Sequence, residues 1–74
     1  MNVIQSATNE TTSVSFSFSA KTIFLRSHGA TDSVVTVNGN SFTLYQDDPY
    51  VALDATSMDG FVVTSGAVSY IALG

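Results

Sequence analysis

The sequence contains one histidine, the residue type most suited to act as a base near neutral pH. His28 lies in Ser27-His28-Gly29, where a hydrolytic triad would need a serine to lose its proton and a carboxylate to orient the ring. The chain has no Gly-x-Ser-x-Gly motif. Because Ser and Asp are frequent here, some of each would lie near any histidine. We therefore predict an exposed loop histidine, no catalytic residues and no enzyme activity.

Aspartates raise the question of a bound cation. A bend between Asp54 and Asp59 would bring two carboxylates together, and calcium binds about six to eight oxygens. The spacing is not that of an EF-hand loop. Asp side chains also favour turns, because they accept hydrogen bonds from the nearby backbone. We predict turns at Asp54–Asp59 and at Asp47-Asp48-Pro49 and no metal or other cofactor, with calcium at Asp54–Asp59 as the open alternative.

Aromatic side chains suggest another kind of site. Tyr45 and Tyr50 would stack on sugar rings if both were exposed on one side. Tyr70 falls among apolar positions and is expected in the core instead. The alternative function is therefore a small carbohydrate-binding module that uses Tyr45 and Tyr50.

Composition limits the partners. The chain has 74 residues, two basic and six acidic side chains, a formal net charge of −4 and no cysteine. The negative charge disfavours nucleic acid and anionic membranes as partners. Neither a signal peptide nor an apolar run of about 18 residues is present. One small domain made in the cytoplasm, without disulfides to stabilise it, is expected.

The elements that position these residues are predicted to be strands. Val14, Phe16 and Phe18 alternate with serines, so that one face is apolar and the other carries hydroxyls. Short runs rich in β-branched and aromatic residues follow, separated by turn residues. The runs are Thr22–Ser27, Ser33–Val37, Ser41–Tyr45, Tyr50–Asp54, Phe61–Thr64 and Ala67–Leu73.

Two hairpins are expected. A two-residue turn at Gly39-Asn40 would pair Val37 with Phe42, whereas a turn at Asn38-Gly39 would pair Val37 with Asn40 and keep the same faces. We predict a two-residue turn at one of these two positions, because a three-residue loop would place Val37 beside Ser41 and scatter the apolar residues.

The second turn, at Ser65-Gly66, would pair Val63 with Val68 and Phe61 with Tyr70.

Two segments are apolar on both faces, which is typical of strands covered on both sides. They are Ile23-Phe24-Leu25 and Ala67–Leu73. In a chain this short, a second layer would come most easily from another subunit or from the N-terminal arm. The predicted protein-contact residues are Ser15, Ser17, Ile23, Leu25, Ile71 and Leu73.

The predicted fold is all-β, a compact antiparallel β-sandwich or small barrel of seven or eight short strands. Residues 1–13 form a polar N-terminal arm or loop, with a possible short strand at 2–5, and residues 14–74 form a single β domain.

In its Ser- and Thr-rich strands, few basic residues, lack of cysteine and Asn/Gly hairpin, the chain resembles the small β-structured decoration or cement proteins of tailed phage capsids. The resemblance implies a non-enzymatic structural virion protein on the capsid surface. Its partners would be copies of itself, most often in trimers, and the major capsid protein. A tail, collar or head-fibre component is the alternative within the same class.

Overall fold

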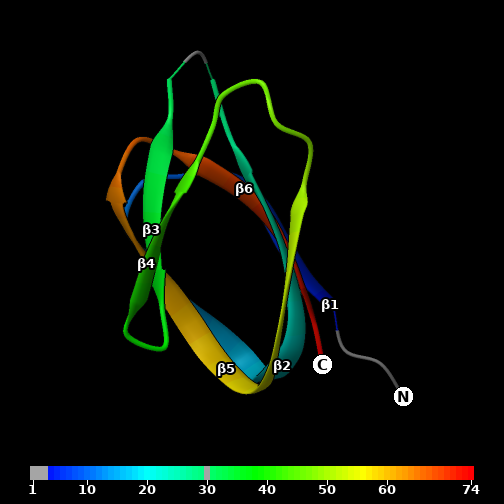
Figure 1. Ribbon diagram of the computed structural model, residues 1–74. Coiled ribbons are helices and arrows are strands. Elements are labelled where there is room, and N and C mark those ends of the chain that lie inside the picture. The colour runs from blue at the N-terminus through cyan, green and yellow to red at the C-terminus, as the bar shows by residue number, and fades with distance from the viewer. Residues whose placement is uncertain (1–3, 30) are drawn as a thin grey trace.

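Six strands form one antiparallel sheet in the computed structural model, which describes residues 4–29 and 31–74. The all-β prediction is confirmed. Within these residues there is no helix that is long and apolar enough to cross a membrane. The order in the sheet is β1-β6-β2-β5-β3-β4 (Figure 1). The strands are β1 (Ile4–Glu10), β2 (Ser13–Ser27), β3 (Ser33–Val37), β4 (Asn40–Leu44), β5 (Val51–Ser65) and β6 (Val68–Leu73).

The two long strands, β2 and β5, run through the whole molecule and give it two halves. Near its end, β2 pairs with β6 and with the start of β5, as Leu25 does with Tyr70 and Val51. Near its start, β2 pairs with the end of β5, as Val14 does with Phe61. Register shifts between these stretches allow both strands to bend, and the sheet curls around a core (Figure 1).

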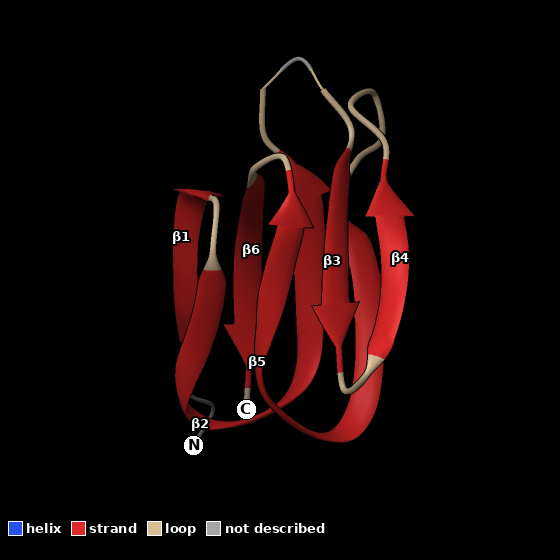
Figure 2. Cartoon of the chain, turned by 90° about the vertical axis from the view of Figure 1, so that its left-hand side faces the viewer, coloured by secondary structure: helices blue, strands red, loops and turns tan. Residues whose placement is uncertain are grey.

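We call the two parts of the sheet the β1–β6 half and the β3–β4 half. The β1–β6 half consists of β1, β6, residues 22–27 of β2 and residues 51–54 of β5. The β3–β4 half consists of β3, β4, residues 13–19 of β2 and residues 60–65 of β5. Figure 2 shows β1 and β6 on one side of the molecule and β3 and β4 on the other.

Continuity of the long strands explains why fewer strands are found than expected. The runs predicted at 14–18 and 22–27 belong to one strand of 15 residues, and those at 50–54 and 61–64 fall almost entirely within a second. At the bend, Ala20 and Met58 are fully buried opposite one another. Their burial keeps the chain extended where turns were expected. The turn predicted at Asp54–Asp59 is therefore wrong, since both residues lie within β5.

The N-terminal segment is also a strand. The prediction of an arm or loop over residues 1–13 is wrong for Ile4–Glu10, which forms β1 and pairs with β6. Residues 2 and 3 of the possible strand 2–5 lie outside the described residues. A polar sequence becomes a strand here because the edge of β6 offers backbone partners, such as Tyr70 for Ala7.

Gln5 joins β1 to the start of β2. Its amide Nε2 donates to the Ser15 carbonyl oxygen at 3.1 Å and to the Tyr70 hydroxyl at 2.8 Å. Its Oε1 accepts from the Ser17 backbone N–H at 3.2 Å. The side chain thus bonds two backbone groups of β2 much as a neighbouring strand would.

The β3–β4 hairpin has the predicted two-residue turn, and of the two possible positions the chain uses Asn38-Gly39. Val37 pairs with Asn40 and Val35 with Phe42. Both turn residues have positive φ, 50° at Asn38 and 81° at Gly39, as a type I′ turn requires. Asn38 Nδ2 also donates to the Ser57 carbonyl oxygen, which ties the turn to β5.

The hairpin predicted at Ser65-Gly66 is wrong as well, because β5 and β6 are not neighbours in the sheet. The chain crosses there from one half to the other. Phe61 and Tyr70 still meet, but as rings packed edge to face across the core, with centroids 5.2 Å apart.

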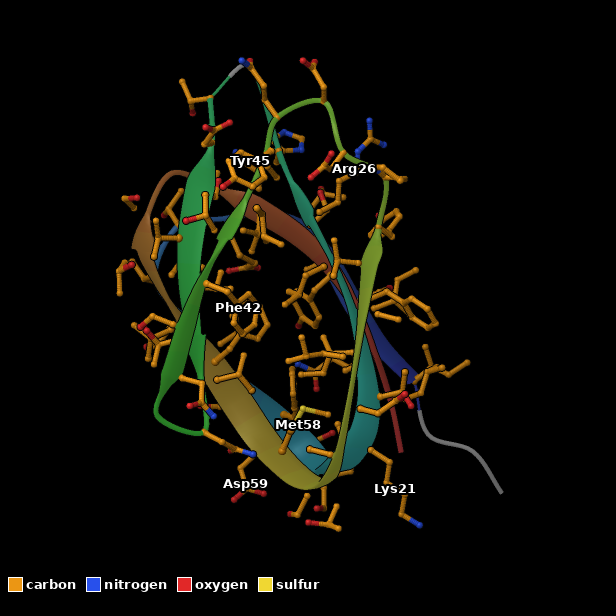
Figure 3. All side chains as sticks on the ribbon, in the orientation of Figure 1. Lys21, Arg26, Phe42, Tyr45, Met58 and Asp59 are labelled. Atoms are coloured by element: carbon orange, nitrogen blue, oxygen red, sulfur yellow. The ribbon has the colours of Figure 1, made fainter. Side chains whose placement is uncertain are left out.

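The core lies between the inner faces of the two halves. Phe16, Phe18, Phe61 and Tyr70 form an aromatic cluster in it. Figure 3 shows Phe42, from β4, and Met58, at the lower bend of β5, both pointing inward. The buried apolar residues are Val14, Ala20, Ile23, Leu25, Val35, Val37, Leu44, Met58, Phe61, Val63, Val68, Tyr70 and Ala72.

Candidate contact surface on the outer face of the β1–β6 half

The outward side chains of the β1–β6 half form ordered rows across four strands. In the middle row, Phe24 of β2 lies between Ala52 of β5 and Ile71 of β6. In the next row, Leu73 lies between Thr22 of β2 and Ile4 of β1. We call these five apolar residues the outer apolar face: Ile4, Phe24, Ala52, Ile71 and Leu73.

This face is accessible. Ile4 is 64% exposed, Ala52 is exposed, and Phe24, Ile71 and Leu73 are half-buried. The strand neighbours of Phe24 and Ile71 are buried in the core, namely Ile23, Leu25, Tyr70 and Ala72. Covering such side chains stabilises a complex by about 25 cal/mol per Å² of apolar surface removed from water.

Polar side chains border the face at its two ends. Asp54 lies beside Thr22, whose Oγ1 donates to Asp54 Oδ1 at 2.7 Å. Arg26 lies beside Ser69 at the other end and is exposed. Arg26 and Asp54 are thus the two charged groups on this outer face.

Of the six predicted contact residues, two lie on this face, two are buried in the core and two lie on another outer surface. Ile71 and Leu73 point outward, whereas Ile23 and Leu25 have no exposed surface and belong to the core. The prediction of Ile23 and Leu25 as contact residues is therefore wrong. Along β2, the side chain of Phe24 points to the opposite face of the strand from those of Ile23 and Leu25. Which of the two faces lies on the outside depends on the direction in which the sheet curls.

Three residues of this face were not predicted from the sequence: Ile4, Phe24 and Ala52. Phe24 had a usable signal, since it sits between two apolar neighbours of opposite parity. Ile4 had none, because it belongs to a segment whose pairing depends on β6, far away in the sequence.

Ser15 and Ser17 lie on a second surface, on the outside of the β3–β4 half. Both are exposed, and their backbone groups are held by Gln5. Hydroxyls continue across this half, where Thr36 Oγ1 and Ser41 Oγ are 2.7 Å apart. We call it the outer hydroxyl face: Ser13, Ser15, Ser17, Thr36, Ser41, Thr43 and Thr64, with Val62 at 46% exposure among them.

The two candidate glycan-binding tyrosines stand at either end of the connection between β4 and β5. Tyr45 is 57% exposed and Tyr50 is 42% exposed. The Asp48 backbone N–H donates to the Tyr45 carbonyl oxygen at 3.0 Å, which forms a turn in this connection. Figure 3 shows Tyr45 near the end of the molecule where the loops gather.

His28 connects the end of β2 to β6. Its backbone N–H donates to the Ala67 carbonyl oxygen at 2.8 Å, and its Nδ1 is 3.3 Å from Ser69 Oγ. Ser69 is only 6% exposed. These contacts fix the position of the connection that follows β2.

Residues 4–29 and 31–74 contain no pocket and no group of three or more His, Asp or Glu side chains placed to hold a metal ion. Asp54 and Asp59 are separated by the bulged part of β5, and Asp59 and Lys21 lie where the long strands bend (Figure 3).

Comparisons with protein-family models, with curated proteins and with solved structures find no match to this chain.

Proposed function

We propose that this protein is a non-enzymatic structural subunit of a larger protein assembly, in which other protein covers the outer apolar face. The observation that carries the proposal is the gathering of Ile4, Phe24, Ile71 and Leu73 on one outer side of a domain whose core is complete without them. Apolar patches on small proteins mark interaction surfaces.

The assembly we propose is a virion, with the protein decorating its capsid and stabilising the major capsid subunits. The composition that resembles decoration proteins supports this assignment, as does the outer hydroxyl face. Ser15 and Ser17 there carry no charge, so covering them costs little desolvation energy. In this proposal the two halves of the sheet act as the layers of a small sandwich, with one outer face toward each neighbour.

Co-sedimentation with purified phage capsids tests the proposal. We expect the chain to sediment with capsids and to raise the temperature at which they lose their DNA. A chain that stays a monomer at micromolar concentration and never sediments with capsids would refute it. Electron-microscopic labelling would separate decoration, which covers the whole capsid, from a tail, collar or head-fibre position at one vertex.

Glycan binding is the second candidate function, and the exposure of Tyr45 and Tyr50 at the two ends of one connection favours it. Exposed aromatic rings stack on the apolar faces of sugars. A glycan array followed by Tyr50→Ala tests it. Binding that disappears in this variant, while the fold is kept, would support a carbohydrate-binding module; an array without any signal would remove it.

A further inference from the structure

We infer that the occupant of the outer apolar face is a second copy of this chain, related to the first by a two-fold axis that lies parallel to the sheet and crosses its strands. The inference rests on the proposed function, because it names the partner that covers the face.

Charge is placed at opposite ends of the face. Asp54 lies in the row of Thr22, and Arg26 lies four residues further along β2. At about 3.3 Å per residue the two rows are about 13 Å apart, too far for the two groups to pair within one chain. Each is therefore available to a neighbouring molecule.

A two-fold axis through the row of Phe24 brings these charges together. The axis reverses the strand direction of the second copy, so the Arg26 end of each chain lies over the Asp54 end of the other. Two equivalent ion pairs result, and Phe24 and Ile71 of one copy lie over the same residues of the other. Such an interface is self-complementary, as two-fold dimers require.

The charge on the rest of the molecule favours this face over others. The chain has a net charge of −4, so most surfaces of two copies repel one another. The outer apolar face is bordered by one cation, Arg26, and one anion, Asp54, whose charges cancel. Of the other acidic residues, Asp32, Asp47 and Asp48 lie in connections between strands, Asp59 lies at the bend of β5, and Glu10 pairs with Val68, which is buried in the core.

Size sets the expected affinity. Four strands about 4.8 Å apart and five residues about 3.4 Å apart give a face of roughly 19 by 17 Å. Interfaces of this extent belong to the small, weak class. We expect a dimer with a Kd on the order of 10 µM, stable at the high local concentration of an assembly.

Charge reversal tests the geometry. Arg26→Asp and Asp54→Arg each replace two attractions with two repulsions, and each should weaken the dimer about tenfold in sedimentation equilibrium at low salt. The double variant restores both pairs with exchanged sign and should return the Kd to within about twofold of the original. Only pairing between these two residues across copies predicts that recovery.

A second pair of variants tests the apolar contact. Ile71→Lys on the outer apolar face should weaken dimerisation about fiftyfold or more, because it places a charge at the centre of the interface. Val62→Lys is the matched control, since Val62 is an exposed apolar residue on the outer hydroxyl face. It should leave the Kd unchanged. Circular dichroism confirms that each variant is folded.

The outcomes separate this inference from the proposed function. A dimer that responds to the charge reversals but never binds capsids supports the inference and refutes capsid decoration. A monomer that binds capsids and loses binding in Ile71→Lys refutes the inference and supports decoration, with the capsid on this face. A trimer, or a dimer indifferent to both the charge reversals and Ile71→Lys, also overturns the inference.

Discussion

The two outer faces of this molecule differ although the same two strands run behind both. Along β2 the outward residues change from Ser15 and Ser17 in the β3–β4 half to Phe24 in the β1–β6 half. Inward residues stay apolar throughout, from Val14 to Leu25. Folding requires only the inner pattern. The difference between the outer faces therefore fits the proposed surroundings, with water or polar protein beside the outer hydroxyl face and apolar protein beside the outer apolar face.

Gly60→Ala, in the β3–β4 half, should have the largest effect on stability. A Cβ at Gly60 would overlap the Val14 carbonyl oxygen, where β5 passes the start of β2 in the β3–β4 half. Backbone on both sides cannot move aside without breaking the pairing. We expect a loss of about 4 kcal/mol in the free energy of unfolding, measured by urea denaturation.

Gly39→Ala is the control for that prediction. Space around Gly39 is open, and only its φ of 81° disfavours a side chain. The expected loss is about 1 kcal/mol. Equal losses in the two variants would mean that the close approach at Gly60 does not hold the β3–β4 half together.

Adjacent residues of β2 sharpen the contrast between the core and the outer apolar face. Leu25→Ala removes a side chain with no exposed surface and should lower the free energy of unfolding by about 3 kcal/mol. Phe24→Ala removes a larger side chain that is half-buried and should cost about 1 kcal/mol in the isolated chain. A larger loss at Phe24 than at Leu25 would reverse the assignment of inner and outer faces.

Gln5→Ala would weaken the link between the two halves. The variant loses two hydrogen bonds to the backbone of β2 and one to Tyr70. We expect a loss of about 2 kcal/mol and faster hydrogen exchange at the Ser17 amide. Ser6→Ala, an exposed neighbour on the same strand, should change neither quantity. Unchanged hydrogen exchange at the Ser17 amide in Gln5→Ala would contradict the link that Gln5 makes between β1 and β2.

The smallest effect on folding is expected from a pair of apolar-to-hydroxyl changes, one on each outer face. Ile71→Thr and Val62→Thr keep a β-branched side chain and should each lower the free energy of unfolding by less than about 1 kcal/mol. The two variants should differ more in surface hydrophobicity than in stability. Ile71→Thr should elute clearly earlier than the parent chain from a hydrophobic-interaction column and Val62→Thr only slightly earlier, because Ile71 belongs to a contiguous patch. The reverse order would contradict the outer apolar face.

Local patterns in the sequence predicted the parts of the fold that depend on neighbouring residues. Alternation placed Val14, Phe16 and Phe18 on one face of a strand. The β3–β4 hairpin has the predicted two-residue turn, and its apolar residues share one face as expected. Both two-residue positions give the same faces, so apolar patterning does not choose between them; the turn lies at Asn38-Gly39, where Asn38 adopts a positive φ that Asn tolerates better than most residues.

Pairings between distant segments could not be predicted. Phe61 and Tyr70 were expected as neighbours in a hairpin, but β6 instead pairs with β1 and β2. Either arrangement buries both rings, so local apolar patterning does not distinguish them. The contact residues of β2 were mispredicted for the same reason. Ile23-Phe24-Leu25 is apolar on both faces of the strand, and only the curl of the sheet turns Phe24 outward.

The sequence by itself determined that this protein is all-β, because alternation of apolar and hydroxyl side chains suits strands alone. It also determined a surface of low charge. Tertiary structure decided how many strands form, that the polar N-terminal segment becomes β1, and which apolar residues remain outside. Those outcomes depend on backbone hydrogen bonds between segments far apart in the chain, and any segment with free N–H and C=O groups can make such bonds whatever its side chains.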